Sequence, residues 1–180
     1  MIYKFRIISE EVSNFKLEIQ ADADSTFLSL RNAILDAVGY SKDQLDSFII
    51  CDDEWRKEKE ITLADMDSDS DEDIWLMDET RLSDLIEDEG QKLAFVFDNL
   101  ANRCFFMEMK EIIFSKDLSE PVCTRKEGRA PKQTQDFDFE PQPIKANTTA
   151  ADLEDFGEDF YGSDSYNEDE FDQSGYDEII

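Results

Sequence analysis

The chain has 180 residues and is strongly acidic: 46 Asp and Glu stand against 18 Lys and Arg, a formal net charge of −28. This charge repels phosphate backbones and anionic membrane surfaces and attracts basic proteins and cations, so we expect no direct nucleic-acid or membrane partner. The chain has no histidine, which excludes Ser–His and Cys–His catalytic triads and removes the commonest general base and zinc ligand. We therefore expect no cofactor.

The cellular compartment is indicated by the cysteines and by the hydropathy of the chain. Three cysteines, scattered along the sequence, are typical of a reducing compartment rather than of a disulfide framework. No apolar run approaches the roughly 20 residues that span a bilayer. The first residues, MIYKFRIISEEV, predict a strand and not a signal peptide. These features predict a cytoplasmic protein.

The first half of the chain predicts strands around one helix. Alternating apolar residues indicate strands at 2–8 and 15–21. The stretch DSTFLSLRNAILDAVGY then predicts a helix with Asp24 or Ser25 as its N-cap and Gly39 as its end. The apolar stripe of this helix consists of Phe27, Leu30, Ile34 and Val38. Two further strands are predicted at 47–55 and 59–63.

The next segment adds a second helix and two strands. TRLSDLIEDEG predicts a short helix that is capped by Thr80 and closed by Gly90. QKLAFVFD and CFFMEMKEIIF alternate as two more strands. Hairpins together with two main helices predict an α+β fold, in which both helices pack on one face of a mixed or antiparallel β-sheet. We expect residues 1–131 to form one domain that folds alone.

The charge is unevenly distributed along the chain. Residues 1–114 carry 28 acids and 12 bases, residues 115–135 carry 3 and 5, and residues 136–180 carry 15 and one. This division indicates a folded body, a linker-like segment and a disordered acidic tail, which we place at 132–180. Eight aromatic residues lie among the acids of the tail and are spaced to dock on a basic partner. The candidates for such contacts are Phe156, Phe160, Tyr161, Tyr166, Phe171 and Tyr176.

An acidic stretch, DMDSDSDEDIWLMDE at 65–79, resembles a calcium-binding loop. Its candidate ligands, at the loop positions one, three, five, seven and twelve, are Asp67, Asp69, Asp71, Asp73 and Asp78. Glu72 stands where the sharp turn of such a loop needs glycine, so an exposed acidic loop is the favoured interpretation and a metal site the alternative. The apolar residues Trp75, Leu76 and Met77 that follow predict a buried strand or turn, with an exposed docking patch as the alternative.

The three cysteines predict different environments. Cys51 precedes three carboxylates at 52–54, which disfavour its thiolate and raise its pKa. Cys104 lies in an aromatic strand and is expected in the core. Cys123 is the most exposed of the three by context and lies near the bases at 125–126, but we expect it to pack rather than to react.

Three blocks of the sequence resemble the plasmid pRiA4b Orf-three-like domain family. The blocks are STFLSLRNAILDAVGYSKDQLDSFII, TRLSDLIEDEGQKLAFVFD and EPVCTRKEGRAP, and the resemblance covers residue 1 to about residue 131. Phe97 and Asp98 stand at the family's tyrosine–aspartate pair, and Cys123 stands at its closing cysteine. Asp98 is therefore the carboxylate to follow, although a cap at the end of a strand is its commoner explanation.

The chain departs from the family after this pair. The family continues with phenylalanine, glycine and aspartate, and then with a tryptophan and a histidine. Asn99, Leu100 and Ala101 stand at the first three positions here, and Arg103 and Phe105 at the last two. The polar aspartate–histidine cluster of the family is thus missing. The family occurs mainly near mobile elements and has no agreed activity, so the resemblance implies a fold rather than a function.

Three functions remain as hypotheses. We favour a non-enzymatic interaction or regulatory module whose acidic tail engages a basic protein. The first alternative is an acidic DNA mimic that occupies the cleft of a DNA-binding protein. The second is a divalent-metal-dependent enzyme, which the missing histidines and the missing polar cluster disfavour.

Overall fold

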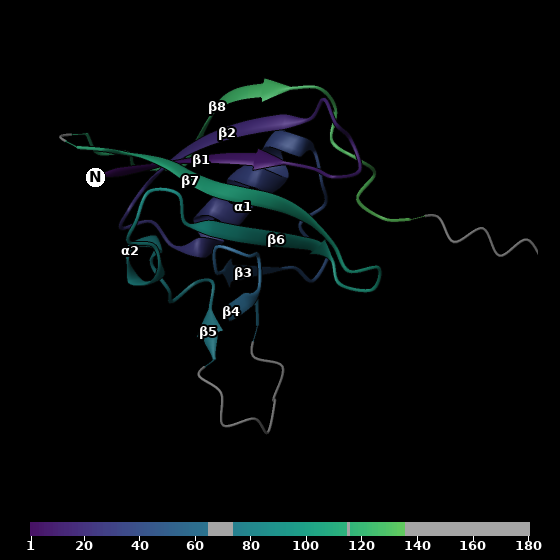
Figure 1. Cartoon of the computed structure of the whole chain (residues 1–180), viewed down its shortest axis with the longest axis horizontal. Helices are drawn as coiled ribbons and strands as arrows, with labels where there is room; N and C mark the ends of the chain where they lie inside the picture. The colour runs from purple at the N-terminus through teal and green to yellow at the C-terminus, as the bar shows by residue number, and fades with distance from the viewer. Residues whose placement is uncertain (65–73, 115, 136–180) are drawn as a thin grey trace, which may run out of the picture. The chain divides into compact units, whose positions relative to one another are not determined.

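An eight-stranded sheet organises the residues that the computed structural model describes, which are 1–64, 74–114 and 116–135 (Figure 1). Its strands lie in the order β5 (Trp75–Leu76), β4 (Lys57–Thr62), β3 (Ser47–Cys51), β6 (Lys92–Asp98), β7 (Arg103–Ile113), β1 (Ile2–Ile8), β2 (Lys16–Asp22) and β8 (Val122–Glu127). Neighbouring strands are antiparallel except β4 and β5, which are parallel. The helices are α1 (Phe27–Val38) and α2 (Leu82–Leu85). The predicted α+β fold with a mixed sheet is confirmed.

One face of the sheet carries the core. Alternate side chains of the long strands point to this face and are fully or almost fully buried, among them Phe5, Ile7, Leu17, Ile19, Phe48, Leu93, Phe95, Phe105 and Met107. Helix α1 lies across the same face (Figure 1), and Leu82 and Leu85 of α2 belong to the same buried cluster. The Phe48 ring lies between Phe27 of α1 at 5.3 Å and Phe95 of β6 at 4.8 Å. Each such buried side chain stabilises the fold by about 1.5–3 kcal/mol.

The N-cap of α1 differs from the prediction. Thr26, and neither Asp24 nor Ser25, caps the helix, because its Oγ1 accepts a hydrogen bond from Ser29 N. The two earlier residues are held in a turn by Asp22, whose Oδ1 accepts from Asp24 N and whose carbonyl accepts from Ser25 N. The other end is as predicted: Gly39 adopts φ 76° and terminates the helix.

Helix α2 is a single turn, shorter than predicted. Its N-cap is Arg81 instead of Thr80, and Asp84 Oδ2 accepts from Arg81 N. Ile86 is extended and fully buried, and Tyr3 Oη donates to its carbonyl at 2.9 Å. The core therefore draws Ile86 out of the helical path, and the helix ends well before Gly90, which instead forms the turn into β6.

Residues 115–135 were expected to be linker-like, and this expectation is wrong where the structure describes them. Strand β8 pairs with β2 from Lys16 opposite Glu127 to Gln20 opposite Val122. Gly128 follows at φ 69°, so close to Asn14 that an added Cβ would lie 2.4 Å from the Asn14 carbonyl oxygen. This edge strand was not predicted, because every residue from 122 to 126 is exposed and the segment therefore lacks the apolar alternation of a half-buried strand.

Candidate functional site

The residues that the sequence singled out do not share one cleft. Trp75 lies on β5 at one edge of the sheet and Cys123 on β8 at the other edge. Asp98 ends β6 in the middle, between these two edges. Trp75 and Leu76 are half-buried and Met77 is fully buried, so the predicted strand or turn is confirmed for these three residues.

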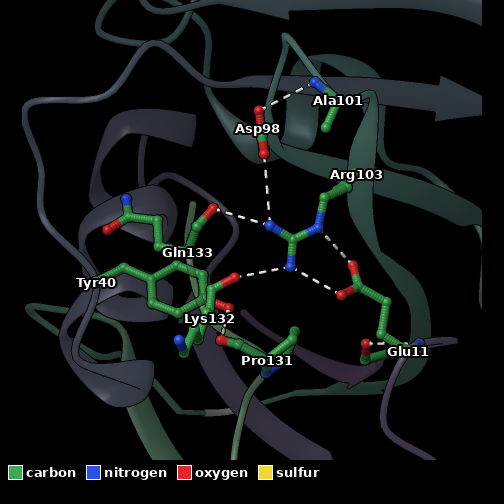
Figure 2. Close-up of polar contacts among 9 residues, drawn as sticks. Glu11, Tyr40, Asp98, Ala101, Arg103, Pro131, Lys132 and Gln133 are labelled. Carbon is green, nitrogen blue, oxygen red and sulfur yellow. Dashed lines mark hydrogen bonds and ion pairs between the residues drawn. The ribbon is translucent and has the colours of Figure 1, made fainter. Parts of the chain in front are cut away.

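Asp98 belongs to a polar cluster around Arg103 (Figure 2). Arg103 forms a fork with Glu11, in which Nε and Nη2 each donate to one carboxylate oxygen at 2.8 Å. Its Nη1 reaches Asp98 Oδ2 at 3.4 Å, while Asp98 Oδ1 accepts from Ala101 N at 3.1 Å. The guanidinium carbon also lies 5.0 Å from the centre of the Phe97 ring. Asp98 is thus a cap at the end of a strand, as expected, and both of its oxygens are engaged.

The same arginine holds the segment that leaves β8. Its Nη2 donates to the Lys132 carbonyl at 2.7 Å and its Nη1 to the Gln133 carbonyl at 3.2 Å. Tyr40 Oη donates to the Pro131 carbonyl at 2.6 Å, and the Gln133 side chain makes two hydrogen bonds to the Ser41 backbone at 2.8 Å each. Figure 2 shows the contacts of Arg103 and Tyr40 with residues 131–133. The cluster therefore fixes the C-terminal end of the described chain on the body.

Burial and charge explain the protonation of this cluster. The Glu11 carboxylate, which accepts two hydrogen bonds, raises the pKa of Arg103 despite the opposing effect of burial, and Asp98 adds to the rise. Burial raises the pKa of Tyr40 well above its ordinary value. Arg103 and Tyr40 therefore keep their protons at physiological pH, so both act as hydrogen-bond donors and neither can act as a general base.

The cysteines occupy three different environments. Cys51 is buried, and burial and then the Asp52 charge raise the pKa of its thiol. Cys104 is half-buried and lies on the face of β7 opposite the core, so its expected core position is wrong; burial raises its pKa to about 11. Cys123 is exposed on β8, which contradicts the packing role expected for it.

An acidic groove lies where β3 ends and β6 begins. Because these strands are antiparallel neighbours, with Cys51 opposite Lys92, the β3–β4 turn and the segment from α2 to β6 meet at one end of the sheet. They enclose a groove of about 540 Å³. Its seven carboxylate residues are Asp52, Asp53, Glu58, Asp84, Glu87, Asp88 and Glu89, and its two basic residues are Lys59 and Lys92.

Both lysines of the groove have internal partners. Lys92 Nζ donates to the Asp53 carbonyl and lies 5.3 Å from the centre of the Trp55 ring. Lys59 Nζ lies 5.5 Å from the centre of the Trp75 ring. Within the described ranges, in contrast, the carboxylates of Asp53, Glu58, Glu87 and Asp88 form no ion pair. The negative charge of these four carboxylates therefore faces solvent.

The turn on one side of the groove is held in place by Asp52. Its Oδ1 accepts from Glu54 N at 2.8 Å and from Arg56 N at 2.9 Å, and its Oδ2 accepts from Arg56 Nε at 2.7 Å. The Arg56 backbone N–H, together with these other hydrogen bonds, lowers the pKa of Asp52. This capped turn also explains why the strand predicted at 47–55 ends at Cys51.

A second, smaller pocket lies beside β3 and β4. It has a volume of about 250 Å³, and its walls are Leu45, Asp46, Ser47, Glu60, Thr62, Leu63, Ala64 and Asn99. Asp46 is almost wholly buried and its Oδ1 accepts from Arg31 Nε at 2.6 Å. Arg31 also donates to the Lys42 and Gln44 carbonyls, at 2.8 and 3.2 Å. This ion pair fixes the connection between α1 and β3.

Two polar atoms of this pocket are unusual. Asp46 Oδ2 and Ser47 Oγ are buried and make no hydrogen bond to any described residue. Burial raises the pKa of Asp46, against the effect of Arg31. Although burial acts to raise the pKa of Glu60, this pKa is lowered overall, because the Lys57 ammonium and the nearby Ser47 hydroxyl outweigh the effect of burial. The distance and angle between Ser47 and Glu60 do not meet the criteria of a hydrogen bond.

The sequence did not predict Arg31, Asp46 or Arg103 as site residues. The signal for Arg31 was present, because it flanks Leu30 and Ile34 on the buried side of α1. Nothing in the sequence linked Glu11 to Arg103, which are 92 positions apart.

Several predicted residues lie outside the part of the chain that the structure describes. They are the loop residues Asp67, Asp69, Asp71 and Asp73 and the tail aromatics Phe156, Phe160, Tyr161, Tyr166, Phe171 and Tyr176. Asp78, the last candidate ligand of the loop, is exposed in the turn after β5. Among the described residues, no group of three or more His, Cys, Asp or Glu could hold a metal ion. In the same residues, no helix has the length and apolar character needed to cross a membrane.

Comparison with known proteins identifies the family. The family model described as "Plasmid pRiA4b ORF-3-like protein" matches residues 8–174, and the chain therefore belongs to this family. The match continues beyond residue 131, where the resemblance seen in the sequence ended. Among curated proteins no match was found. The crystal structure of a protein of unknown function from Methanosarcina mazei Go1 is similar at 18% identity and a TM-score of 0.55. The similarity covers 69% of this chain and 68% of that one, and it shows the fold alone.

Proposed function

We propose that this member of the plasmid pRiA4b ORF-3-like family is a non-enzymatic interaction module whose acidic surface engages a basic segment of another protein. The observation that carries the proposal is the acidic groove. Seven carboxylate residues and two lysines line it, and both lysines have internal partners. A groove with a large excess of one sign of charge attracts and orients a partner of the opposite sign.

The polar cluster around Arg103 supports this function and gives no support to an enzyme. Arg103 is balanced by Glu11 and Asp98, and every oxygen of these two carboxylates has a partner. Asp98, which stands at the family's aspartate, thus contacts the arginine that holds residues 132 and 133 in place. The acidic tail that follows residue 135 adds 15 acids to the same chain, which favours a basic partner further.

The test is binding of a short peptide of alternating lysine and glycine to the full chain, followed by calorimetry at two salt concentrations. Glu58→Lys and Glu87→Lys place bases in the groove. Glu120→Lys makes the same change of charge at an exposed residue outside it and serves as the matched control. We expect each groove variant to weaken binding by about tenfold, because a desolvated charge contact contributes about 1.5 kcal/mol. The control should change it by less than about threefold, because screened surface charges contribute little.

Equal losses in all three variants would show that only net charge matters and would contradict the assignment to the groove. Deletion of residues 136–180 measures the contribution of the tail in the same assay. A DNA mimic makes a different prediction: duplex DNA would compete with this chain for a basic protein partner.

A further inference from the structure

We propose that the pocket walled by Asp46, Ser47, Glu60 and Thr62 binds an alkylammonium group, such as the side chain of a lysine. That this lysine belongs to the basic partner rests on the function proposed above. The pocket lies beside β3 and β4, and it is separate from the acidic groove, with which it shares no wall residue.

The hydrogen-bonding groups of the pocket call for a donor. Asp46 Oδ2 is a buried carboxylate oxygen without a partner, and Ser47 Oγ is a buried hydroxyl oxygen without one. Leaving such groups unpaired is costly, so native structures rarely retain them without a ligand, an ion or a bound water. The obvious donors nearby are already engaged: Arg31 by Asp46 Oδ1 and two carbonyls, and Asn99 Nδ2 by the Leu45 carbonyl. Both oxygens are closed to solvent in this structure, so a ligand that brings its own N–H groups supplies what is missing once the wall side chains turn toward the pocket.

The charge of the pocket favours a cation over a neutral donor. Glu60 adds a second carboxylate to the wall, and its pKa is lowered, so it is ionised at neutral pH. Asp46 and Glu60 each have one cationic partner, Arg31 and Lys57. Each partner satisfies only part of the carboxylate it contacts, and the net charge of the chain, −28, adds a general attraction for cations.

The size and the apolar walls favour an alkyl chain behind the charge. The pocket volume of about 250 Å³ is below the roughly 300–1,000 Å³ of sites for drug-sized ligands. Leu45, Leu63 and Ala64 form apolar wall beside the polar residues. A lysine side chain presents an apolar stem and an ammonium with three donors, which matches both parts of the wall. Among the described residues no group of three or more His, Cys, Asp or Glu could hold a metal ion, and only two carboxylates line this pocket.

The probe is Nα-acetyl-lysine methylamide, titrated into the full chain and followed by amide NMR. The uncharged analogue with norleucine in place of lysine is the control for the alkyl chain. We expect the lysine probe to shift the amides of residues 45–47, 60–64 and 99, and the norleucine probe to leave them unchanged.

Two variants test the hydroxyl. Ser47→Ala should lower the affinity for the lysine probe about tenfold, because one hydrogen bond to the charged ammonium is lost. It should change the stability of the unliganded protein little, because the hydroxyl makes no direct hydrogen bond and contributes only to the lowered pKa of Glu60. Ser119→Ala removes an exposed hydroxyl outside the pocket and should change neither quantity. If the Ser47 hydroxyl had a merely structural role, Ser47→Ala would instead lower the stability of the unliganded protein and leave the affinity for the lysine probe unchanged.

The outcomes separate this inference from the proposed function. If the lysine probe leaves the pocket amides unmoved while the lysine–glycine peptide still binds the groove, the pocket assignment is wrong and the proposed function stands. If the probe shifts the pocket while the groove variants bind the peptide normally, the ammonium site stands and the groove is wrong. Equal shifts with norleucine would show an apolar site and overturn the inference.

Discussion

Replacement of Arg103 by methionine tests whether the polar cluster holds the chain end. Methionine keeps the length and the apolar stem of the side chain but removes the charge and all the donors. Arg103 is 8% exposed and donates to Glu11, Asp98 and the carbonyls of residues 132 and 133. Arg103→Met therefore removes the hydrogen-bond donor of all four acceptors and the positive charge beside the two carboxylates.

The cost follows from the burial of the partners. Removing one member of a buried ion pair costs about 3–5 kcal/mol, because the other charge stays buried. Glu11 is 39% exposed and can turn to water, whereas Asp98 is only 13% exposed. We therefore expect Arg103→Met to lower the free energy of unfolding by about 2–4 kcal/mol. With a urea dependence of about 2 kcal/mol per molar, the midpoint falls by about 1–2 M.

The assay is urea unfolding of the full chain together with native-state hydrogen exchange. Arg125→Met is the control, since Arg125 is 54% exposed in its pair with Glu127 and should cost less than about 1 kcal/mol. In Arg103→Met we also expect faster exchange of the Ser41 amide, which donates to Gln133 Oε1. Unfolding free energies of the two variants that agree within about 0.5 kcal/mol would refute the role of the cluster.

Three further predictions use other parts of the fold. Gly128→Ala should cost more stability in urea unfolding than Gly39→Ala; both residues have positive φ, but a Cβ meets backbone only at Gly128, and equal costs would contradict this. The pKa of Asp22 is lowered, mainly because the Asp24 backbone N–H donates to its carboxylate. The contribution of Asp22 to the free energy of unfolding is therefore fully present above pH 3.8, the ordinary pKa, and is lost as the pH falls below that value. Asp22→Asn should therefore reduce stability at pH 7 and flatten the acid branch of the stability curve. Iodoacetamide at pH 8 should modify Cys123 well before Cys104, whose thiol is half-buried with a pKa of about 11; mass spectrometry showing comparable rates would contradict this.

The sequence predicted the parts of the fold that depend on local periodicity. Alternation located β1, β2, β6 and β7, and the apolar stripe with Gly39 located α1. It was wrong where a tertiary contact decides the local structure. Ile86 is drawn into the core and shortens α2, and Asp22 shifts the start of α1 to Thr26. Strand β8 escaped notice because an exposed edge strand shows no alternation between apolar and polar residues.

The candidate sites were harder to predict, because they depend on pairs far apart in the sequence. Asp98 was singled out through the family resemblance, but its partner Arg103 was noted only as a departure from the family. The partner of Arg103, Glu11, comes from the first hairpin, and only the folded sheet brings the two together. The acidic groove likewise needs the pairing of β3 with β6 before its two sides meet.

The distribution of ion pairs shows why excess acid is available for a partner. The described bases are largely used inside the domain: Arg31 pairs with Asp46, Arg103 with Glu11, and Lys126 donates to the carbonyl of Ala37. Each acid that pairs with a base neutralises it locally, so the acids in excess carry the field that a partner meets. A basic segment that binds the unpaired acids of the groove breaks no ion pair of the domain. A partner that bound at the Arg103 cluster would first have to break the two hydrogen bonds between Arg103 and Glu11. Binding is therefore expected at the groove, and the cluster is expected to keep its contacts in the complex.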